Sequence, residues 1–287
     1  MNYTNAIIKF AQKNAPDMYW ISVVENAKSS TQSIMKANQT NNSYSVSKLF
    51  TVTALGMLFD EGKLSPDEKV IDVLRDYIIE DMDKKWNEVT VDMVMRHSFG
   101  IEHGFLDIDG ENINDFEKKY GSRTDFLKIV FSAKLPKKLS TEFCYSDAAY
   151  YLLSRVVCKK AGMDLCDYLR IRLFNPLQFE EFAWSKCPMG YSMGATGLYV
   201  RCSDIAKLCQ VYLYDGIYNN KRILSEIWCR AVLERGYELR GSNGIYRKGG
   251  MLGQMAYIDK KRNIAVAWQG YDTTGYQEKM LEFLSQL

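Results

Sequence analysis

Apolar and polar positions alternate along the chain with two different periods, and the period changes from one region to the next. Residues 3–14 repeat apolar side chains at the spacing of a helix, and Pro16 follows the end of that pattern. Residues 18–24 are almost continuously apolar over the length of a strand, and residues 33–38 form a second candidate strand. The beginning of the chain therefore predicts one helix followed by two strands.

The end of the chain shows the same two periods in the opposite order. Residues 253–259 and 263–270 are strand-like runs joined by a short polar turn, which is typical of a β-hairpin. Residues 276–287 again repeat apolar side chains at helical spacing. Because a sheet must bury its apolar face against another layer, we expect both ends of the chain to build one antiparallel sheet covered by helices.

Helical patterns with polar loops between them fill the middle of the chain. We expect helices at residues 67–79, 90–97, 124–132, 146–161, 164–173, 202–215 and 225–234. The pattern predicts a mixed α/β (α+β) fold, with a sheet region of residues 1–64 and 190–287 and an inserted helical region of residues 65–189. The two regions would form one intertwined domain.

A helix expected from Ser45 to about Glu61 is apolar almost all round, so we expect it to be buried. Ser45 and Lys48 are three residues apart and share a face of this helix. A serine in the first turn lies near free backbone N–H groups and the positive end of the helix dipole. Burial lowers the pKa of a lysine, and a neutral amine beside a hydroxyl forms a nucleophile and its base. The alternative is a serine N-cap followed by an exposed lysine.

The composition is that of an ordinary globular protein, with 47% hydrophobic and 25% charged residues. A net charge of +2 implies neither a nucleic-acid partner nor an anionic membrane surface. No apolar run approaches the roughly 18 residues of a membrane span. The first twenty residues lack the features of a signal peptide, and the seven cysteines contain no CxxC pair. We therefore expect a cytoplasmic protein, with a leader trimmed from the chain as the alternative.

Other motifs carry little weight. Residues 190–194 match the G-x-S-x-G nucleophile elbow around Ser192, but that motif requires a later histidine. The histidines of the chain, His97 and His103, both precede Ser192 and have no third ligand at metal spacing. No phosphate-binding glycine loop follows a predicted strand. The sequence therefore predicts neither a metal nor a cofactor.

Five segments in order resemble one known superfamily. They are YSVSKLFTVTALGMLFDEGKLSPDEKVIDVL (44–74), VTVDMVMRHSFGIEHG (89–104), FCYSDAAYYLLSRVVCKKAG (143–162), MGATGLYVRCSDIAKLCQVYLYDG (193–216) and RKGGMLGQMAYID (247–259). Together they resemble the serine β-lactamases and penicillin-binding proteins, above all the branch of class C β-lactamases, D-alanyl-D-alanine carboxypeptidases and related esterases. The resemblance implies a β-lactamase/transpeptidase-like fold, an antiparallel sheet flanked by helices plus a helical subdomain.

The resemblance also implies roles for particular residues. Ser45 would be the acylated nucleophile, Lys48 its proton acceptor, and Tyr145 the partner acid or base that protonates the leaving group. Asp147 stands where the family usually has asparagine. An ionised aspartate only accepts hydrogen bonds, and it would hold Lys48 protonated. Either Tyr145 then carries more of the base role, or amide substrates bind poorly, or Asp147 merely caps a helix.

The last segment departs from the family pattern as well. Lys248, Gly249 and Gly250 stand where the family has Lys-Thr-Gly or His-x-Gly on a strand. A strand with glycines lets its backbone approach a ligand closely, and Lys248 would attract a substrate carboxylate. Gly249 lacks the hydroxyl that the family offers to that carboxylate. The alternative is a basic turn with two flexible glycines.

The resemblance predicts a serine hydrolase that forms an acyl-enzyme with a small ester, a D-amino-acid amide or peptide, or a β-lactam. Asp147, Gly249 and the missing signal peptide favour esters and amides over β-lactams. A catalytically silent ligand-binding member of the same fold is the alternative. In either case the partner is a small molecule or peptide. We expect the loops at residues 104–122 and 235–246 to set specificity, and nothing in the sequence predicts the oligomeric state.

Overall fold

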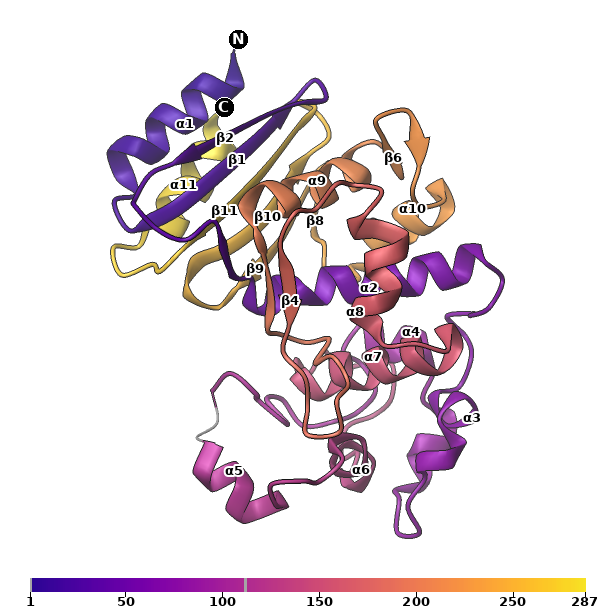
Figure 1. The fold of residues 1–287 in the computed structure, drawn as a ribbon. Helices are drawn as coiled ribbons and strands as arrows, with labels where there is room; N and C mark the ends of the chain where they lie inside the picture. Colours follow the sequence, from indigo (N-terminus) through magenta and orange to yellow (C-terminus); the bar gives the residue numbers. More distant parts are fainter. Residues whose placement is uncertain (1, 111–112) are drawn as a thin grey trace. The chain divides into compact units, whose positions relative to one another are not determined.

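The computed structural model describes residues 2–110 and 113–287, and the chain forms two compact units (Figure 1). Unit 1 consists of Met1–Val46, Leu173–Ala183 and Leu198–Leu287, and unit 2 of Ser47–Arg172 and Trp184–Gly197. The expected division into domains at residues 65 and 190 stays a prediction.

A six-stranded sheet forms the centre of unit 1. Its order is β2 (Lys28–Ser33), β1 (Met18–Glu25), β11 (Ile264–Gly270), β10 (Gln254–Asp259), β9 (Ile245–Gly250) and β8 (Arg240–Ser242). Every neighbouring pair is antiparallel. The strand from the beginning of the chain thus lies beside the last strand, and the expected single sheet from both ends is confirmed.

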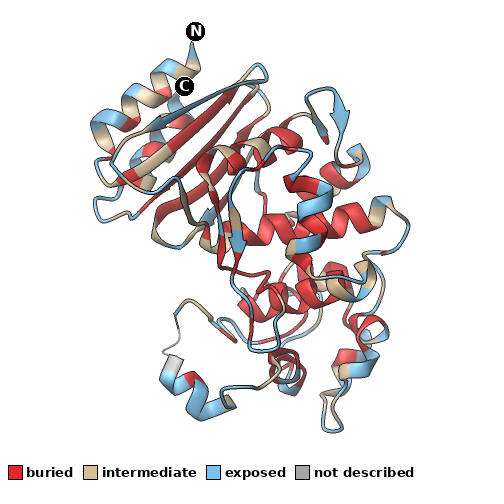
Figure 2. Ribbon diagram, in the orientation of Figure 1, coloured by how far each residue is buried: buried red, intermediate tan, exposed pale blue. Residues whose placement is uncertain are grey.

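Both faces of this sheet are covered, because β10 and β11 are buried at every residue (Figure 2). On one face, α1 (Tyr3–Asn14) and α11 (Tyr276–Gln286) pack together over the strands, and the rings of Phe10 and Phe283 stack with centroids 4.0 Å apart. On the other, α9 (Cys202–Leu213) packs on β1, β10 and β11. The alternation of side chains along a strand supplies an apolar surface to each layer.

Smaller elements complete unit 1. A second sheet has the order β3 (Thr40–Asn42), β5 (Leu198–Arg201) and β4 (Phe182–Trp184). The 3₁₀ turn η1 (Tyr44–Val46) packs against β9 and β10. The remaining elements are the hairpin β6 (Ile217–Tyr218) and β7 (Lys221–Arg222), helix α10 (Glu226–Arg235) and the turn η5 (Met251–Gly253).

Unit 2 is helical and is built around α7 (Asp147–Ala161). Helix α2 (Ser47–Asp60) packs on α7, and its residues are buried from Ser47 to Leu58. The other helices are α3 (Val70–Val73), α4 (Val91–Met95), α5 (Ile113–Tyr120), α6 (Phe126–Ser132) and α8 (Leu165–Leu169). An all-round apolar helix needs partners on every side, and α7, with eleven of its fifteen residues buried, supplies one of them to α2.

Some expected elements are displaced or shorter. The strand expected at residues 33–38 is wrong, because the strand is β2, which ends at Ser33. Its sequence, KSSTQS, is a mostly exposed edge without apolar periodicity. The helix expected at residues 67–79 contains α-helix only in α3 and a 3₁₀ turn at Arg75–Tyr77. The mixed α/β class, with an antiparallel sheet flanked by helices, is confirmed.

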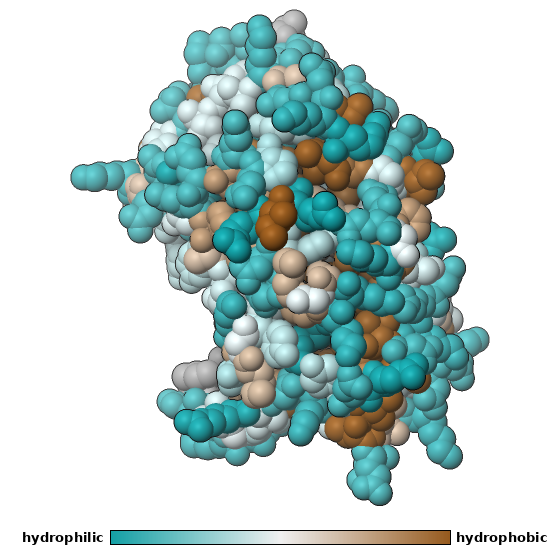
Figure 3. Space-filling view, turned by 45° about the vertical axis from the view of Figure 1, so that its right-hand side comes forward, coloured by the Kyte–Doolittle hydropathy of each residue, from teal (hydrophilic) through white to brown (hydrophobic). Residues whose placement is uncertain are grey.

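The surface carries no large apolar face in the view of Figure 3, where hydrophilic residues predominate and apolar ones form separate patches. Exposed large apolar side chains come from several elements, and Ile227 on α10 is the most exposed of them at 70%. Among the described residues, no helix combines the length and apolarity that crossing a bilayer requires.

Candidate active-site residues

Lys48 is a fully buried cation in the first turn of α2, within unit 2. Its Nζ donates to Asp147 Oδ1 at 2.6 Å and to the backbone oxygen of Ala195 at 2.8 Å. The same ammonium lies 4.8 Å from the centroid of the Tyr145 ring. An isolated charge in such a place would be strongly unfavourable, so the carboxylate, the carbonyl and the ring face together stabilise it. Lys48, Tyr145 and Asp147 therefore come together in one cluster.

Asp147 is the first residue of α7, and it is not the cap of that helix. Ser146 is the N-cap, since its Oγ accepts from the N–H of Ala148 at 3.0 Å. The second carboxylate oxygen of Asp147 accepts from the N–H of Ile108 at 3.2 Å. A negative charge in the first turn is favourable there. Capping alone therefore does not account for Asp147, which bridges Lys48 and the loop before α5.

Tyr145 is half-buried and is held through its backbone and its ring. Its carbonyl accepts from the N–H of Gly104 at 2.7 Å. Its ring stacks on His97, with centroids 4.7 Å apart and planes 29° apart. His97 accepts from the N–H of Cys144 with its carbonyl and from the N–H of Ser146 with Nδ1. His97 is thus a structural residue that fixes the segment carrying Tyr145.

The glycine-rich segment 193–197 explains how a carbonyl reaches Lys48. A Cβ on Gly194 would lie 2.5 Å from the backbone oxygen of Tyr150, so only glycine permits this approach to α7. Thr51 of α2 donates its Oγ1 to the carbonyl of Gly194 at 2.8 Å. The next carbonyl along the chain is that of Ala195, which accepts from Lys48.

Asp109 is a further acidic residue of this cluster that sequence reasoning missed. Thr196 donates its Oγ1 to Asp109 Oδ2 at 2.5 Å. Burial raises the pKa of the Asp109 carboxyl, and the negative charge of Asp147 raises it further, while the hydrogen bond from Thr196 and the charge of Lys48 act in the opposite direction. Asp109 lies in an irregular loop, where periodicity gives no signal.

Ser45 lies in unit 1, in the turn η1, and the chain enters α2 two residues later. The turn is anchored at Ser43, whose N–H and Oγ both donate to the carbonyl of Leu198 in β5. Tyr44 adopts a left-handed φ of 44°, and its N–H donates to Asn42 Oδ1. Ser45 is half-buried, in a turn that packs against β9.

The two glycines of β9 differ in what surrounds them. A Cβ on Gly250 would lie 2.7 Å from the backbone oxygen of Ser43, closer than real Cβ contacts come. A Cβ on Gly249 would meet only Met255 Cε at 3.7 Å and a backbone oxygen at 4.0 Å, which is ordinary contact. Glycine at 250 is therefore what allows β9 to approach the turn of Ser45.

Lys248 precedes these glycines and is buried in an ion pair with Glu238. Glu238 lies between α10 and β8 and is itself only 2% exposed. We expected Lys248 to attract a substrate carboxylate, whereas in the structure its ammonium pairs with a carboxylate of the protein. Glu238 was not anticipated, because nothing in its local sequence marks it.

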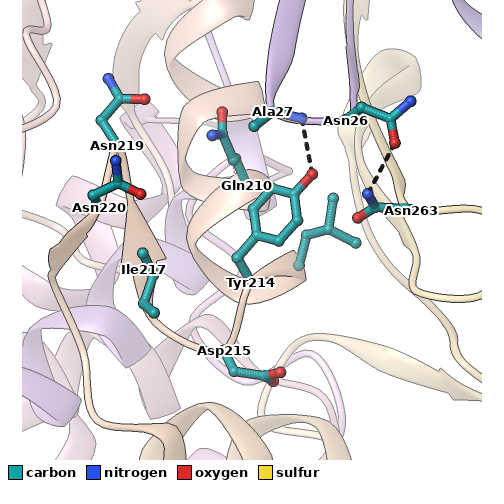
Figure 4. Close-up of a pocket in the computed structure, with 10 residues that line it drawn as sticks. Asn26, Ala27, Gln210, Tyr214, Asp215, Ile217, Asn219, Asn220 and Asn263 are labelled. Atoms are coloured by element: carbon teal, nitrogen blue, oxygen red, sulfur yellow. Dashed lines mark hydrogen bonds between the residues drawn. The ribbon is translucent and has the colours of Figure 1, made fainter.

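The pocket lined by several asparagines and the serine of the G-x-S-x-G segment both have structural explanations. A cavity of about 690 Å³ in unit 1 is lined by Asn26, Asn219, Asn220 and Asn263 among others (Figure 4). All four asparagines have a left-handed φ, which asparagine favours in turns, so turn geometry accounts for them.

Ser192 is fully buried and donates its Oγ to Asp164 at 2.6 Å, with no helix directly after it. Among the described residues, no three metal-ligating side chains gather into a site.

Comparison with known proteins gives a family and a fold. The model of the family Beta-lactamase matches residues 12–270. Penicillin-binding protein 4 of Amycolatopsis lactamdurans is 30% identical over 137 residues, which are 48% of this chain and 34% of that protein. The chain spans about a third of the length of the curated relatives that it matches.

Solved structures extend the likeness to nearly the whole chain. The D-stereospecific amidohydrolase from Streptomyces sp. superposes with a TM-score of 0.71 at 15% identity, covering 97% of each chain. EstCE1, a hydrolase with promiscuous acyltransferase activity, gives a TM-score of 0.72 at 13% identity, again over 97% of each chain. At these identities the likeness concerns the fold, which is the β-lactamase/transpeptidase-like arrangement expected from the five sequence segments.

Proposed function

This chain belongs to the Beta-lactamase family, and we propose that it is a serine hydrolase that works through an acyl-enzyme intermediate. The observation that carries the proposal is the buried cluster of Lys48, Tyr145 and Asp147. Burial of a lysine is costly unless the charge is paired, and Lys48 is fully buried with Asp147 as its partner. Ser45 stands three residues before that lysine in the chain, where the family has its nucleophile.

In the first step the Oγ of Ser45 attacks the substrate carbonyl, and its proton must leave. The carboxylate of Asp147 stabilises the ammonium form of Lys48, so Lys48 is a poor proton acceptor while the pair is intact. We therefore assign the transfer to Tyr145, whose phenol takes the proton of Ser45 while giving its own to the leaving group. Lys48 contributes a fixed positive charge beside the ring. Water then releases the acyl group by the reverse transfer.

The negative charge that develops on the carbonyl oxygen needs donors that are already in place. We assign this role to the N–H of Ser45 and to a backbone N–H at the end of β9. The packing of η1 against β9 supports the assignment. The close approach of Gly250 to the Ser43 carbonyl supports it as well.

Small esters and D-amino-acid amides or peptides are the substrates that we favour over β-lactams. Asp147 lacks the N–H donor of the family's asparagine, which can bind a polar amide substrate. Gly249 lacks the hydroxyl that the family offers to the substrate carboxylate. The structural neighbours include an amidohydrolase and EstCE1, which fits this choice. The alternative is a catalytically silent binding protein, and the ion pair that occupies Lys48 is the observation that favours it.

Intact-mass measurement tests the nucleophile. The protein is incubated separately with a penicillin, a cephalosporin and a fluorophosphonate, and the adduct is mapped by peptide digestion. We expect an adduct on Ser45, strongest with the fluorophosphonate, because that reagent needs only an activated serine. Ser45→Ala should lose both the adduct and ester hydrolysis, while Ser192→Ala, a matched control at the G-x-S-x-G segment, should keep both.

Two results would overturn the proposal. Full ester hydrolysis by Ser45→Ala would remove Ser45 from the chemistry. A protein that is folded by circular dichroism but forms no adduct with any of the three reagents would instead be the silent binding member.

A further inference from the structure

The ion pair of Glu238 and Lys248 is an unusual feature of unit 1. Both side chains are nearly inaccessible, with side-chain exposures of 2% and 9%. The backbone of Glu238 has a φ of 68°, in the left-handed region that a glutamate seldom adopts. Strained backbone of this kind persists where the surrounding structure enforces it, and it gathers at functional sites. Turn geometry would favour glycine or asparagine here, so the carboxylate itself calls for an explanation.

Lys248, one member of the pair, lies on β9, the strand to which we assign an oxyanion donor. Lys248 is one residue before Gly249 and two before Gly250, whose close approach brings β9 against the turn of Ser45. All of these residues belong to unit 1. The charge on Lys248 therefore lies on the same short stretch of strand as the proposed oxyanion donor.

We propose that Glu238 determines specificity by occupying Lys248, so that the site accepts esters or amides whose leaving group carries no carboxylate. The inference rests on the proposed function and names its substrate class. A substrate carboxylate could reach Lys248 only by displacing Glu238. That exchange would break a buried ion pair, and a substrate carboxylate beside Glu238 would be repelled by its negative charge.

Gly249 points to the same substrate class by an independent observation. The space around it would admit a Cβ in ordinary contact, so packing does not exclude a serine or threonine there. The strand nevertheless offers no hydroxyl at this position. Two groups could hold a substrate carboxylate on this strand. The charge of Lys248 is neutralised by Glu238, and the hydroxyl at position 249 is absent.

A matched pair of esters measures the effect. One is the phenyl ester of an N-acylglycine, and the other is the same ester with a carboxyl group at position 3 of the phenol. The readout is the ratio of kcat/KM for the carboxylated ester to that for the neutral one. We expect the wild type to favour the neutral ester, and Glu238→Gln to raise the ratio by about tenfold or more, because a charge-assisted contact to Lys248 becomes available.

Asp259→Asn is the matched control. Asp259 is also a buried carboxylate of unit 1, paired with Arg262 at 2.6 Å, but it lies at the opposite end of β10, facing Ile245 rather than Lys248. Asp259→Asn removes one negative charge, as Glu238→Gln does, but it leaves the partner of Lys248 in place. We therefore expect it to leave the ratio unchanged. A general effect of net charge or of loosened packing would shift the ratio in both variants.

The wild type alone also tests the inference, should Glu238→Gln fail to fold. Phenylboronic acid and 3-carboxyphenylboronic acid are serine-directed inhibitors that differ only in the carboxyl group, and we expect the carboxyl to bring no gain in affinity. Preference of the wild type for the carboxylated ester or inhibitor by about tenfold would overturn the inference and leave the serine hydrolase intact. An unchanged ratio in folded Glu238→Gln would overturn it as well. Absence of Ser45-dependent turnover of both esters would overturn the proposed function, and the inference with it.

Discussion

Asp109 is a partly buried carboxyl whose pKa is raised, first by burial and also by the charge of Asp147, against the hydrogen bond from Thr196. A raised pKa means that folding favours the neutral form of the carboxyl. The contribution of this carboxyl to folding stability is therefore fully present below its unfolded pKa of about 3.8, and it is lost as the pH rises through the higher folded pKa. Asp109→Asn fixes the neutral form. We expect it to raise the free energy of unfolding near pH 7 by up to about 1 kcal/mol, since water screens part of the charge.

Denaturant unfolding at several pH values between about 4 and 8 measures this gain, which should shrink toward the acidic end. Asp67→Asn, at an exposed position of the same unit, is the control and should show no such trend. A less stable Asp109→Asn at neutral pH would mean that the attraction of Lys48 outweighs burial, contrary to the prediction.

At the residue scale, the sequence marks candidate site residues by their motifs but does not mark the residues that surround them. Ser45, Lys48, Tyr145 and Asp147 follow from the motif segments, and pairing of Asp147 with Lys48 follows from their charges. Asp109 does not follow, because its partner Thr196 is 87 residues away in the chain. Contacts made by irregular loops over such distances leave no periodic trace in a sequence.

At the scale of the element, strand β9 depends on one of its two glycines. A Cβ on Gly250 would clash with the Ser43 carbonyl at 2.7 Å, whereas a Cβ on Gly249 would have ordinary contacts. Gly250→Ala should therefore push β9 away from the turn of Ser45. We expect a loss of about 1–3 kcal/mol in stability, as for other overpacked sites, and slower labelling of Ser45 by a fluorophosphonate.

Gly249→Ala is the matched control for stability, and we expect its free energy of unfolding to stay within about 0.5 kcal/mol of the wild type. Thermal and denaturant unfolding of both variants make the comparison. Equal losses in the two would show that glycine is needed for backbone freedom along the whole strand, and the steric argument for position 250 would fail.

Elements with a buried stripe or face were predictable, and elements without one were not. Helices α1 and α11 follow from apolar periodicity, whereas α2 and the hairpin of β10 and β11 follow from nearly continuous apolar runs. Strand β2 is held by backbone hydrogen bonds to β1 while its side chains face water, so the apolar run at residues 33–38 was mistaken for it. Helix α3 was predicted too long because apolar residues such as Leu74 continue beyond its end into a 3₁₀ turn.

At the scale of the molecule, unit 1 joins chain segments from the two ends. Strands β1 and β11 are neighbours, and one apolar cluster contains Ile7 of α1, Val23 of β1, and Met280 and Leu284 of α11. The pairing of the two ends was predictable because helix and strand patterns mirror each other there.

Shared burial of this kind should make the two ends unfold together. Leu284 is 1% exposed, and Leu284→Ala should lower the free energy of unfolding by about 2–5 kcal/mol through lost contacts and the cavity left behind. If both ends form one cooperative structure, hydrogen exchange from the amides of β1 should be facilitated by the same free energy, although β1 lies more than 250 residues away in the chain. Ser285→Ala, on the exposed side of α11, should change neither quantity. If α11 exchanged faster in Leu284→Ala while β1 kept its protection, the last helix would be an independent cover, and the sheet would not need both ends of the chain to stay folded.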